Sequence, residues 1–206
     1  MFILSQSGWP KNSKDNICQV QDTELEKKYL NAGYERYERI YKIKVQYKEY
    51  TVICLEFRND TKGTEPILII PEFLVPGRPY PIYVYLYAIY LYSSDPEKGQ
   101  RQAAEETRKL FGLTTFAHTT LGRALKSFIC VIEKCAETPN EANDETAVEE
   151  NAKASEFPTV KATETLRKKA ASFLRNILTL TGLQQVVSAF CEIAREWFVK
   201  YGHFLL

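Results

Sequence analysis

Two amphipathic segments separated by Gly112 constrain the fold of this chain more than any other feature. Within Lys98–Ile132, a first stripe of residues recurs at the spacing that lines one side of a helix, and the charged residues lie away from it. We therefore expect a first helix that ends at Gly112, because glycine readily leaves helical backbone geometry. The stripe comprises Ala103, Thr107, Leu110 and Phe111.

A second helix is expected to begin near Phe116. Thr114 or Thr115 can cap it, because a threonine oxygen accepts a hydrogen bond from an amide of the first turn. Its apolar side comprises Ala117, Leu121, Ala124, Leu125, Phe128, Ile129 and Ile132. Its opposite side comprises Thr115, His118, Thr119, Gly122, Arg123 and Lys126. This helix should bury one face and present the other.

Two short helices joined by a glycine turn are typical of a helix-turn-helix, whose second helix enters the major groove of DNA. Hydroxyl groups bind phosphates, and the guanidinium fork matches the paired acceptors of guanine. The candidate DNA-binding residues are Thr115, His118, Thr119, Arg123 and Lys126 on the second helix and Arg101 and Arg108 on the first. Helical hairpins with glycine turns are common, so two packed helices with a solvated polar face remain the alternative.

The segments RQAAEETRKLFGL and FAHTTLGRAL follow PEFLVPGRPYP and an aromatic run. Together they resemble the sequences of a family of uncharacterised bacterial proteins related to the N-terminal half of insertion-sequence transposases. Members typically carry a small zinc ribbon, a leucine-proline-rich strand and then a helix-turn-helix. The resemblance covers roughly residues 34–135 and implies duplex-DNA binding. Cys18 and Cys54 stand alone, with no Cys-x-x-Cys anywhere, so we expect a degenerate ribbon without its metal.

The segment before the helix-turn-helix indicates a small antiparallel β unit. A helix capped by Asp22 is expected through Leu30, and alternation predicts a strand from Tyr34 onward. Its partner should be Tyr50–Phe57, and Ile67–Ile70 should form a third strand. Prolines in residues 71–81 predict a stiff extended connector.

The run Ile82–Tyr92 is compatible with a strand or a helix, and the resemblance favours a core helix there. Asp95 and Pro96 then predict the start of the next helix. Beyond Pro158, two helices separated by Gly182 are expected, and the second has an apolar stripe wide enough to need a partner. That partner is the preceding helices or a second copy of the chain.

The formal net charge of +1 conceals an uneven distribution. Residues 137–157 hold seven acidic residues and one lysine, which leaves 26 basic and 19 acidic residues elsewhere. That basic excess is compatible with a DNA partner. Residues 137–158 have few apolar side chains and predict a flexible acidic linker, with a DNA-mimicking tail as the alternative.

Composition also narrows the function classes. Five cysteines without a secretory signal favour reduced thiols and a cytoplasmic protein, and the eleven apolar residues from Ile82 are too few to span a membrane as a helix. With two histidines and no phosphate-binding glycine motif, we expect no enzyme activity and no cofactor. The alternative to DNA binding is a non-enzymatic interaction module whose C-terminal helices bind a protein partner or form a homo-oligomer.

The expected fold class is therefore α+β, divided into five segments. These are a β unit over 1–70, a connector over 71–81, a helical core over 82–136, an acidic linker over 137–158 and a C-terminal helical hairpin over 159–206.

Overall fold

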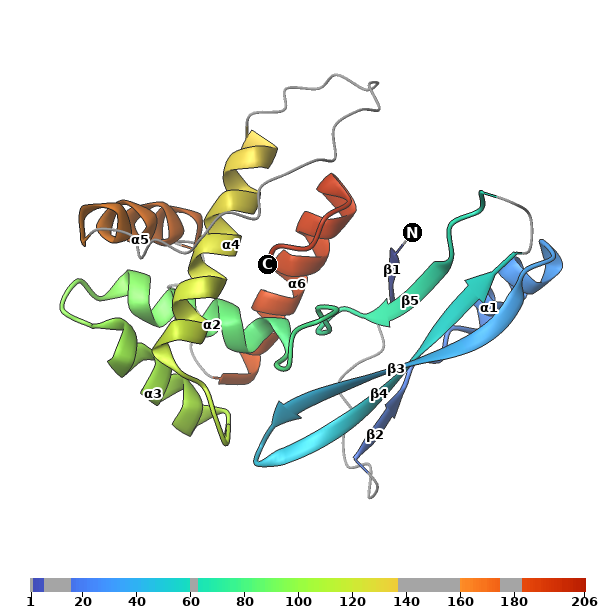
Figure 1. Ribbon diagram of the computed structural model, residues 1–206, viewed down its shortest axis with the longest axis horizontal. Coiled ribbons are helices and arrows are strands. Elements are labelled where there is room, and N and C mark those ends of the chain that lie inside the picture. The colour runs from blue at the N-terminus through green and yellow to red at the C-terminus, as the bar shows by residue number, and fades with distance from the viewer. Residues whose placement is uncertain (1, 6–15, 60–62, 137–159, 175–182) are drawn as a thin grey trace.

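The computed structural model describes residues 2–5, 16–59, 63–136, 160–174 and 183–206, and its fold is α+β, as the sequence predicts (Figure 1). The strands are β1 (Phe2–Ser5), β2 (Ile17–Gln19), β3 (Glu35–Val45), β4 (Lys48–Arg58) and β5 (Ile67–Pro71). The helices are α1 (Thr23–Asn31), α2 (Ile82–Ser94), α3 (Gln100–Leu110), α4 (His118–Ala136), α5 (Val160–Leu174) and α6 (Leu183–Tyr201). The expected acidic linker lies outside the described residues.

The β3–β4 hairpin is the centre of the sheet, and its two strands pair antiparallel along their whole length, from Glu35 opposite Arg58 to Val45 opposite Lys48. Strand β3 takes one edge of β4, so β2 and β5 share the other edge, where β2 is parallel and β5 antiparallel to β4. Strand β1 extends the sheet by pairing parallel with β5. The three predicted strands are confirmed, whereas β1 and β2 were not predicted.

Helix α1 lies at the far end of the sheet from the other helices (Figure 1). The Asp22 side chain caps the helix by accepting a hydrogen bond from the Leu25 amide at 3.1 Å, as predicted. Tyr29 on the buried side of α1 packs against Phe57 of β4, with ring centroids 5.3 Å apart. The helix therefore covers one face of the hairpin near the end of β4.

Helix α2 is the element around which the other helices gather. Nine of its 13 residues are buried, because its sequence is apolar on every side. Helices α3, α4, α5 and α6 all pack against it. The helical conformation expected for this run is confirmed, and its tyrosines are core residues, since Tyr83 and Tyr87 both contact the Phe111 ring.

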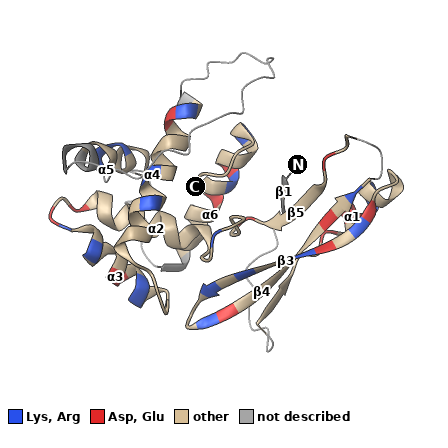
Figure 2. Ribbon diagram, viewed as in Figure 1, with Lys and Arg blue, Asp and Glu red and all other residues tan. Residues whose placement is uncertain are grey.

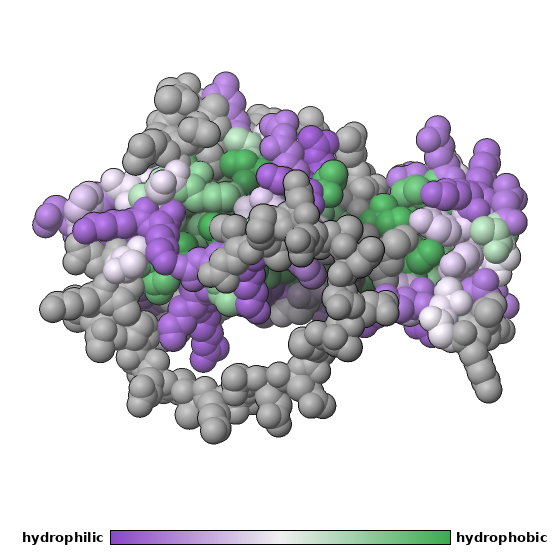
Figure 3. All heavy atoms as spheres, turned by 90° about the horizontal axis from the view of Figure 1, so that it is seen from above, coloured by the Kyte–Doolittle hydropathy of each residue, from purple (hydrophilic) through white to green (hydrophobic). Residues whose placement is uncertain are grey.

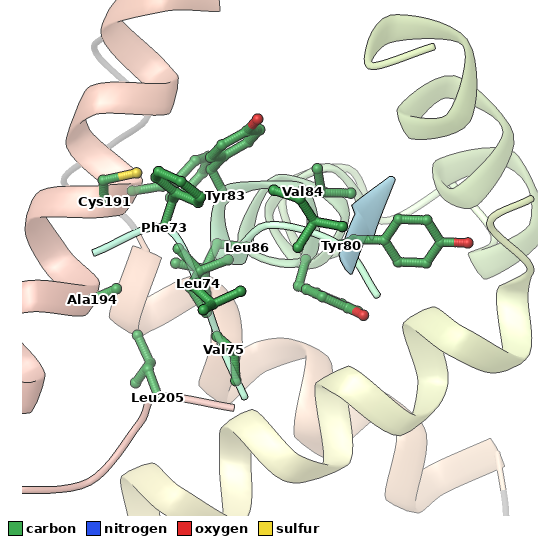
Figure 4. Close-up of a cluster of buried hydrophobic side chains, with 14 of the residues drawn as sticks. Phe73, Leu74, Val75, Tyr80, Tyr83, Val84, Leu86, Cys191, Ala194 and Leu205 are labelled. Atoms are coloured by element: carbon green, nitrogen blue, oxygen red, sulfur yellow. The ribbon is translucent and has the colours of Figure 1, made fainter. Parts of the chain in front are cut away.

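The proline-rich segment between β5 and α2 is irregular but not extended, which corrects the prediction of a stiff connector. It turns twice, with the Leu74 amide donating to the Pro71 carbonyl and the Arg78 amide to the Val75 carbonyl. Figure 4 shows why it folds in: Phe73, Leu74 and Val75 lie in one buried cluster with side chains of α2 and α6. Burial of these apolar residues outweighs the preference of the prolines for an extended chain.

Helix α3 begins later than the sequence suggests. Asp95 ends α2, and its side chain accepts from the Glu97 amide two residues on, which forms a local turn instead of a helix cap. The first turn of α3 instead begins at Gly99, whose carbonyl accepts from the Ala103 amide. The predicted helix start at Asp95 and Pro96 was therefore wrong by four residues.

The two C-terminal helices both pack on α2. Arg167 of α5 donates to the carbonyls of Pro96 and Lys98 and lies over the Tyr92 ring, which fastens α5 to the α2–α3 loop. Part of the apolar stripe of α6 is buried within the chain: Phe190 lies against Tyr90 of α2 and Trp197 against Phe173 of α5, while Phe198 and Tyr201 are half-buried. The buried part of the stripe therefore packs against the preceding helices.

The surface is mixed in character. In the view from above, hydrophilic side chains project at the ends of the molecule and hydrophobic residues appear between them (Figure 3). None of the described helices combines the length and apolar character needed to cross a bilayer. The exposed large hydrophobic side chains are spread over the sheet and the helices: Ile17, Leu30, Tyr37, Ile40, Tyr47, Leu110 and Val199.

Candidate nucleic-acid interface

Helix α4 divides into a buried and an exposed side, as its sequence predicts. Leu121, Ala124, Leu125, Phe128 and Ile129 are buried against the other helices. His118, Thr119, Arg123, Lys126 and Cys130 are exposed. The exposed side chains therefore project from a helix whose position is fixed by packing on the opposite side, which is the arrangement that keeps a binding surface in register.

The beginning of α4 is held by Tyr80, a residue of the proline-rich segment. Its hydroxyl donates to the Thr115 carbonyl oxygen and lies 3.0 Å from the Thr115 hydroxyl. Its ring meets Phe116 edge to face, with centroids 5.3 Å apart. The helix starts at His118, two residues after the predicted position, because the buried Phe116 ring anchors the preceding chain to the core. Thr115 is exposed and is positioned by Tyr80.

The two candidate arginines of α3 differ in what surrounds them. Arg101 is exposed and follows Gln100, whose side-chain oxygen would lie 3.3 Å from a Cβ placed on Gly122 of α4. The start of α3 therefore lies close to α4. Arg108 instead forms two hydrogen bonds with the Glu105 carboxylate, at 2.7 and 3.0 Å, and these lower the pKa of Glu105. Arg108 offers less unneutralised charge than Arg101.

Two further cations, which the sequence did not single out, are linked to α4, Arg78 directly and Lys44 through the backbone next to Arg78. Arg78 donates to the Ser127 hydroxyl of α4 at 3.4 Å, and the neighbouring Pro79 carbonyl accepts from the Lys44 amide of β3 at 2.8 Å. These contacts bring three segments together. We call the set of Lys44, Arg78, Arg123 and Lys126 the basic cluster. Figure 2 shows that α4 and β3 both carry lysines or arginines.

The basic cluster has little acidic compensation. Residues 107–132 contain four lysines and arginines and no aspartate or glutamate. In the part of the chain that the structure describes, Arg78, Arg123 and Lys126 form no ion pair, and Glu49, which lies opposite Lys44, pairs with Lys42 at 2.9 Å. The sequence signal that pointed to this surface is the polar side of the second helix, opposite its apolar stripe. The sequence alone did not indicate that Lys44 and Arg78 are linked to this surface.

The cysteines give no sign of a metal centre. Cys18 pairs with Val52, two residues before Cys54, so the two side chains lie on the same face of neighbouring strands. Burial raises the pKa of both thiols, that of Cys54 to about 12, and the proximity of Cys18 contributes to the latter. Among the described residues, no group of three or more His, Cys, Asp or Glu could hold a metal ion.

We expect the exposed Cys130 to react with iodoacetamide at pH 8 at least about 10²-fold faster than Cys54 or Cys191, because the reactive species is the thiolate. Burial raises the pKa of the Cys54 and Cys191 thiols to about 12, so little thiolate forms at pH 8. Both side chains are also buried, which keeps the reagent away from them. Peptide mass spectrometry after timed labelling measures the rates, and labelling in denaturant supplies the control. Equal rates in the native protein would contradict the described packing.

Comparison of the chain with family models, with curated protein sequences and with solved structures finds no match in any of the three.

Proposed function

We propose that this protein binds duplex DNA through a helix-turn-helix, with α3 as its first helix and α4 as the helix that enters the major groove. The observation that carries the proposal is the exposed side of α4, where Thr119, Arg123 and Lys126 project from a helix packed on its other side. Hydroxyl and cationic groups are the side chains that contact phosphates and guanine edges.

The dimensions and the charge of the surface suit this partner. The major groove is about 12 Å wide and admits one α-helix. Thr115 and His118 lie at the N-terminal end of α4, which is the end that contacts bases in helix-turn-helix proteins. Arg78 adds a cation alongside the helix through its contact with Ser127, and Arg101 lies on the α3 side. We propose that both contact the DNA backbone beside the groove.

A transposable-element origin is part of the same proposal, and it rests on the resemblance of residues 34–135 to transposase front halves. The competing function, an interaction module that uses its C-terminal helices, needs an uncovered apolar face. On α6, the stripe residues Phe190, Ala194 and Trp197 are buried against the rest of the same chain, which leaves less of this face for a partner. This burial favours the DNA proposal over the competing one.

The test is salt-dependent binding to a fluorescein-labelled 30-base-pair duplex of random sequence, measured by anisotropy. We expect affinity to fall by about 10³-fold between 50 and 200 mM salt, because a binder with several phosphate contacts displaces as many counterions. Changing Arg123→Ala and Lys126→Ala together should reduce the slope of log affinity against log salt by about 2. The fold should persist, because both side chains are exposed.

The matched control is Lys27→Ala with Lys28→Ala, which removes the same charge from exposed positions on α1, at the far end of the sheet from α4 (Figure 1). This variant should keep the parent slope. If the parent shows no salt-dependent DNA binding, the proposal is wrong and the interaction module becomes the better reading. If both double variants lose the same amount, binding depends on net charge and α4 has no special part in it.

A further inference from the structure

The tip of the β3–β4 hairpin lies directly on the turn of the helix-turn-helix (Figure 1). The Gln46 amide donates to the Phe111 carbonyl at 2.8 Å, and the Tyr47 amide donates to the Gly112 carbonyl at 2.5 Å. Phe111 and Gly112 lie just after the end of α3. Two adjacent backbone hydrogen bonds therefore join the sheet to the segment that orients α4.

Both sides of this junction have unusual backbone geometry. Gln46 and Tyr47 have φ values of 53° and 57°, in the left-handed region that residues with side chains adopt at a cost. Gly112 has a φ of 58°, and a Cβ there would lie 2.9 Å from two carbon atoms of the Tyr47 ring. The close approach of the tip thus requires glycine at position 112. The contact between Gly112 and Tyr47 fixes the position of the hairpin relative to the turn before α4.

The side chains of the tip point outward even though its backbone is docked. Tyr47 is 72% exposed, and Lys44 and Lys48 are exposed on the two strands that flank it. The only carboxylate close to the tip in the described sheet is Glu49, and Lys42 holds it at 2.9 Å. The tip therefore presents an exposed lysine on each face of the hairpin, because Lys44 lies opposite Glu49 and Lys48 opposite Val45, with the Tyr47 phenol between the two strands.

We propose that this tip is a second DNA contact, which binds backbone phosphates flanking the groove that α4 enters. The inference rests on the proposed function, because it concerns the same duplex. Two observations carry it beyond that proposal. The tip is hydrogen-bonded to the turn before α4, and its exposed Lys44, Tyr47 and Lys48 offer the donors that phosphates accept. A purely structural brace would need only the backbone bonds.

The experiment uses the full chain, the same random duplex and the double variant Lys44→Ala with Lys48→Ala. Losing two phosphate contacts should reduce the salt slope by about 2 and weaken binding at 0.1 M salt by about tenfold for each contact. Combined with the Arg123 and Lys126 changes, the reductions in slope should add, because the two surfaces contact different phosphates. A second variant, Lys44→Gln with Lys48→Gln, keeps much of each side-chain stem and covers the case in which the alanine variant folds poorly.

Four outcomes separate this inference from the proposed function. A lower slope for both tip variants, with an unchanged thermal midpoint, supports the inference. A parent slope in the tip variants, together with a reduced slope in the α4 variant, overturns the inference and leaves the proposed function standing. A reduced slope in the tip variants and a parent slope in the α4 variant moves the DNA contact from α4 to the hairpin. A parent that binds no duplex overturns both.

Discussion

Replacing Phe128 by alanine is expected to lower the free energy of unfolding by about 3–5 kcal/mol. Phe128 is fully buried on α4, and its ring meets Phe173 of α5 edge to face with centroids 5.4 Å apart. Alanine would leave a cavity between two helices that cannot easily close, since α2 also packs against both. Equilibrium unfolding in urea, followed by circular dichroism, measures the change.

The matched control is Cys130→Ala, two residues along the same helix on its exposed side. It should change the unfolding free energy by less than about 0.5 kcal/mol, because it removes no buried contact. A large loss at Cys130 and a small one at Phe128 would mean that α4 is rotated about its axis. That result would also withdraw the DNA proposal, which needs Thr119, Arg123 and Lys126 on the outside.

The second large effect is expected at Trp197, where alanine should also cost about 3–5 kcal/mol. The indole ring of this α6 residue contacts Phe173 of α5 at 5.5 Å and Tyr201 at 4.3 Å between ring centroids. Trp197 thus joins α6 to α5. Its loss should loosen α6 from the core, and both the urea midpoint and hydrogen exchange of the α6 amides should report this.

Val199 provides the control within α6, because it is 78% exposed and lies two residues from Trp197. Val199→Ala should leave stability within about 0.5 kcal/mol of the parent. If Val199→Ala is the costlier change, and the cost depends on protein concentration, then a second copy covers the outer side of α6. That outcome would revive the homo-oligomer alternative.

Local patterns were sufficient to predict much of this fold. The Asp22 cap, the alternation in β3 and β4 and the two stripes around Gly112 each depend on residues within a few positions of one another. Such signals need no knowledge of the rest of the molecule. The exposed and buried sides of α4 were predictable for the same reason, since helical periodicity alone places Arg123 opposite Leu125.

Contacts between distant segments could not be predicted in this way. Strands β1 and β2 are too short to show alternation and exist only because β5 and β4 offer edges to them. The start of α3 was predicted at the wrong residue because the Asp95 side chain accepts a hydrogen bond from the Glu97 amide in a local turn. The same residues are compatible with a helix cap at Asp95, so the sequence alone does not distinguish the two. Arg78 and Lys44 joined the candidate site only through bonds to Ser127 and Pro79.

The central position of α2 has a consequence for the order in which the protein can fold during synthesis. Helix α2 leaves the ribosome well before α5 and α6, and both of those helices pack against it. Until α5 and α6 have been made, the parts of α2 that they cover stay in contact with water or with other molecules. Closure of the core is therefore a late event dominated by contacts of long sequence separation, which slows folding and lengthens the period in which nascent chains can associate.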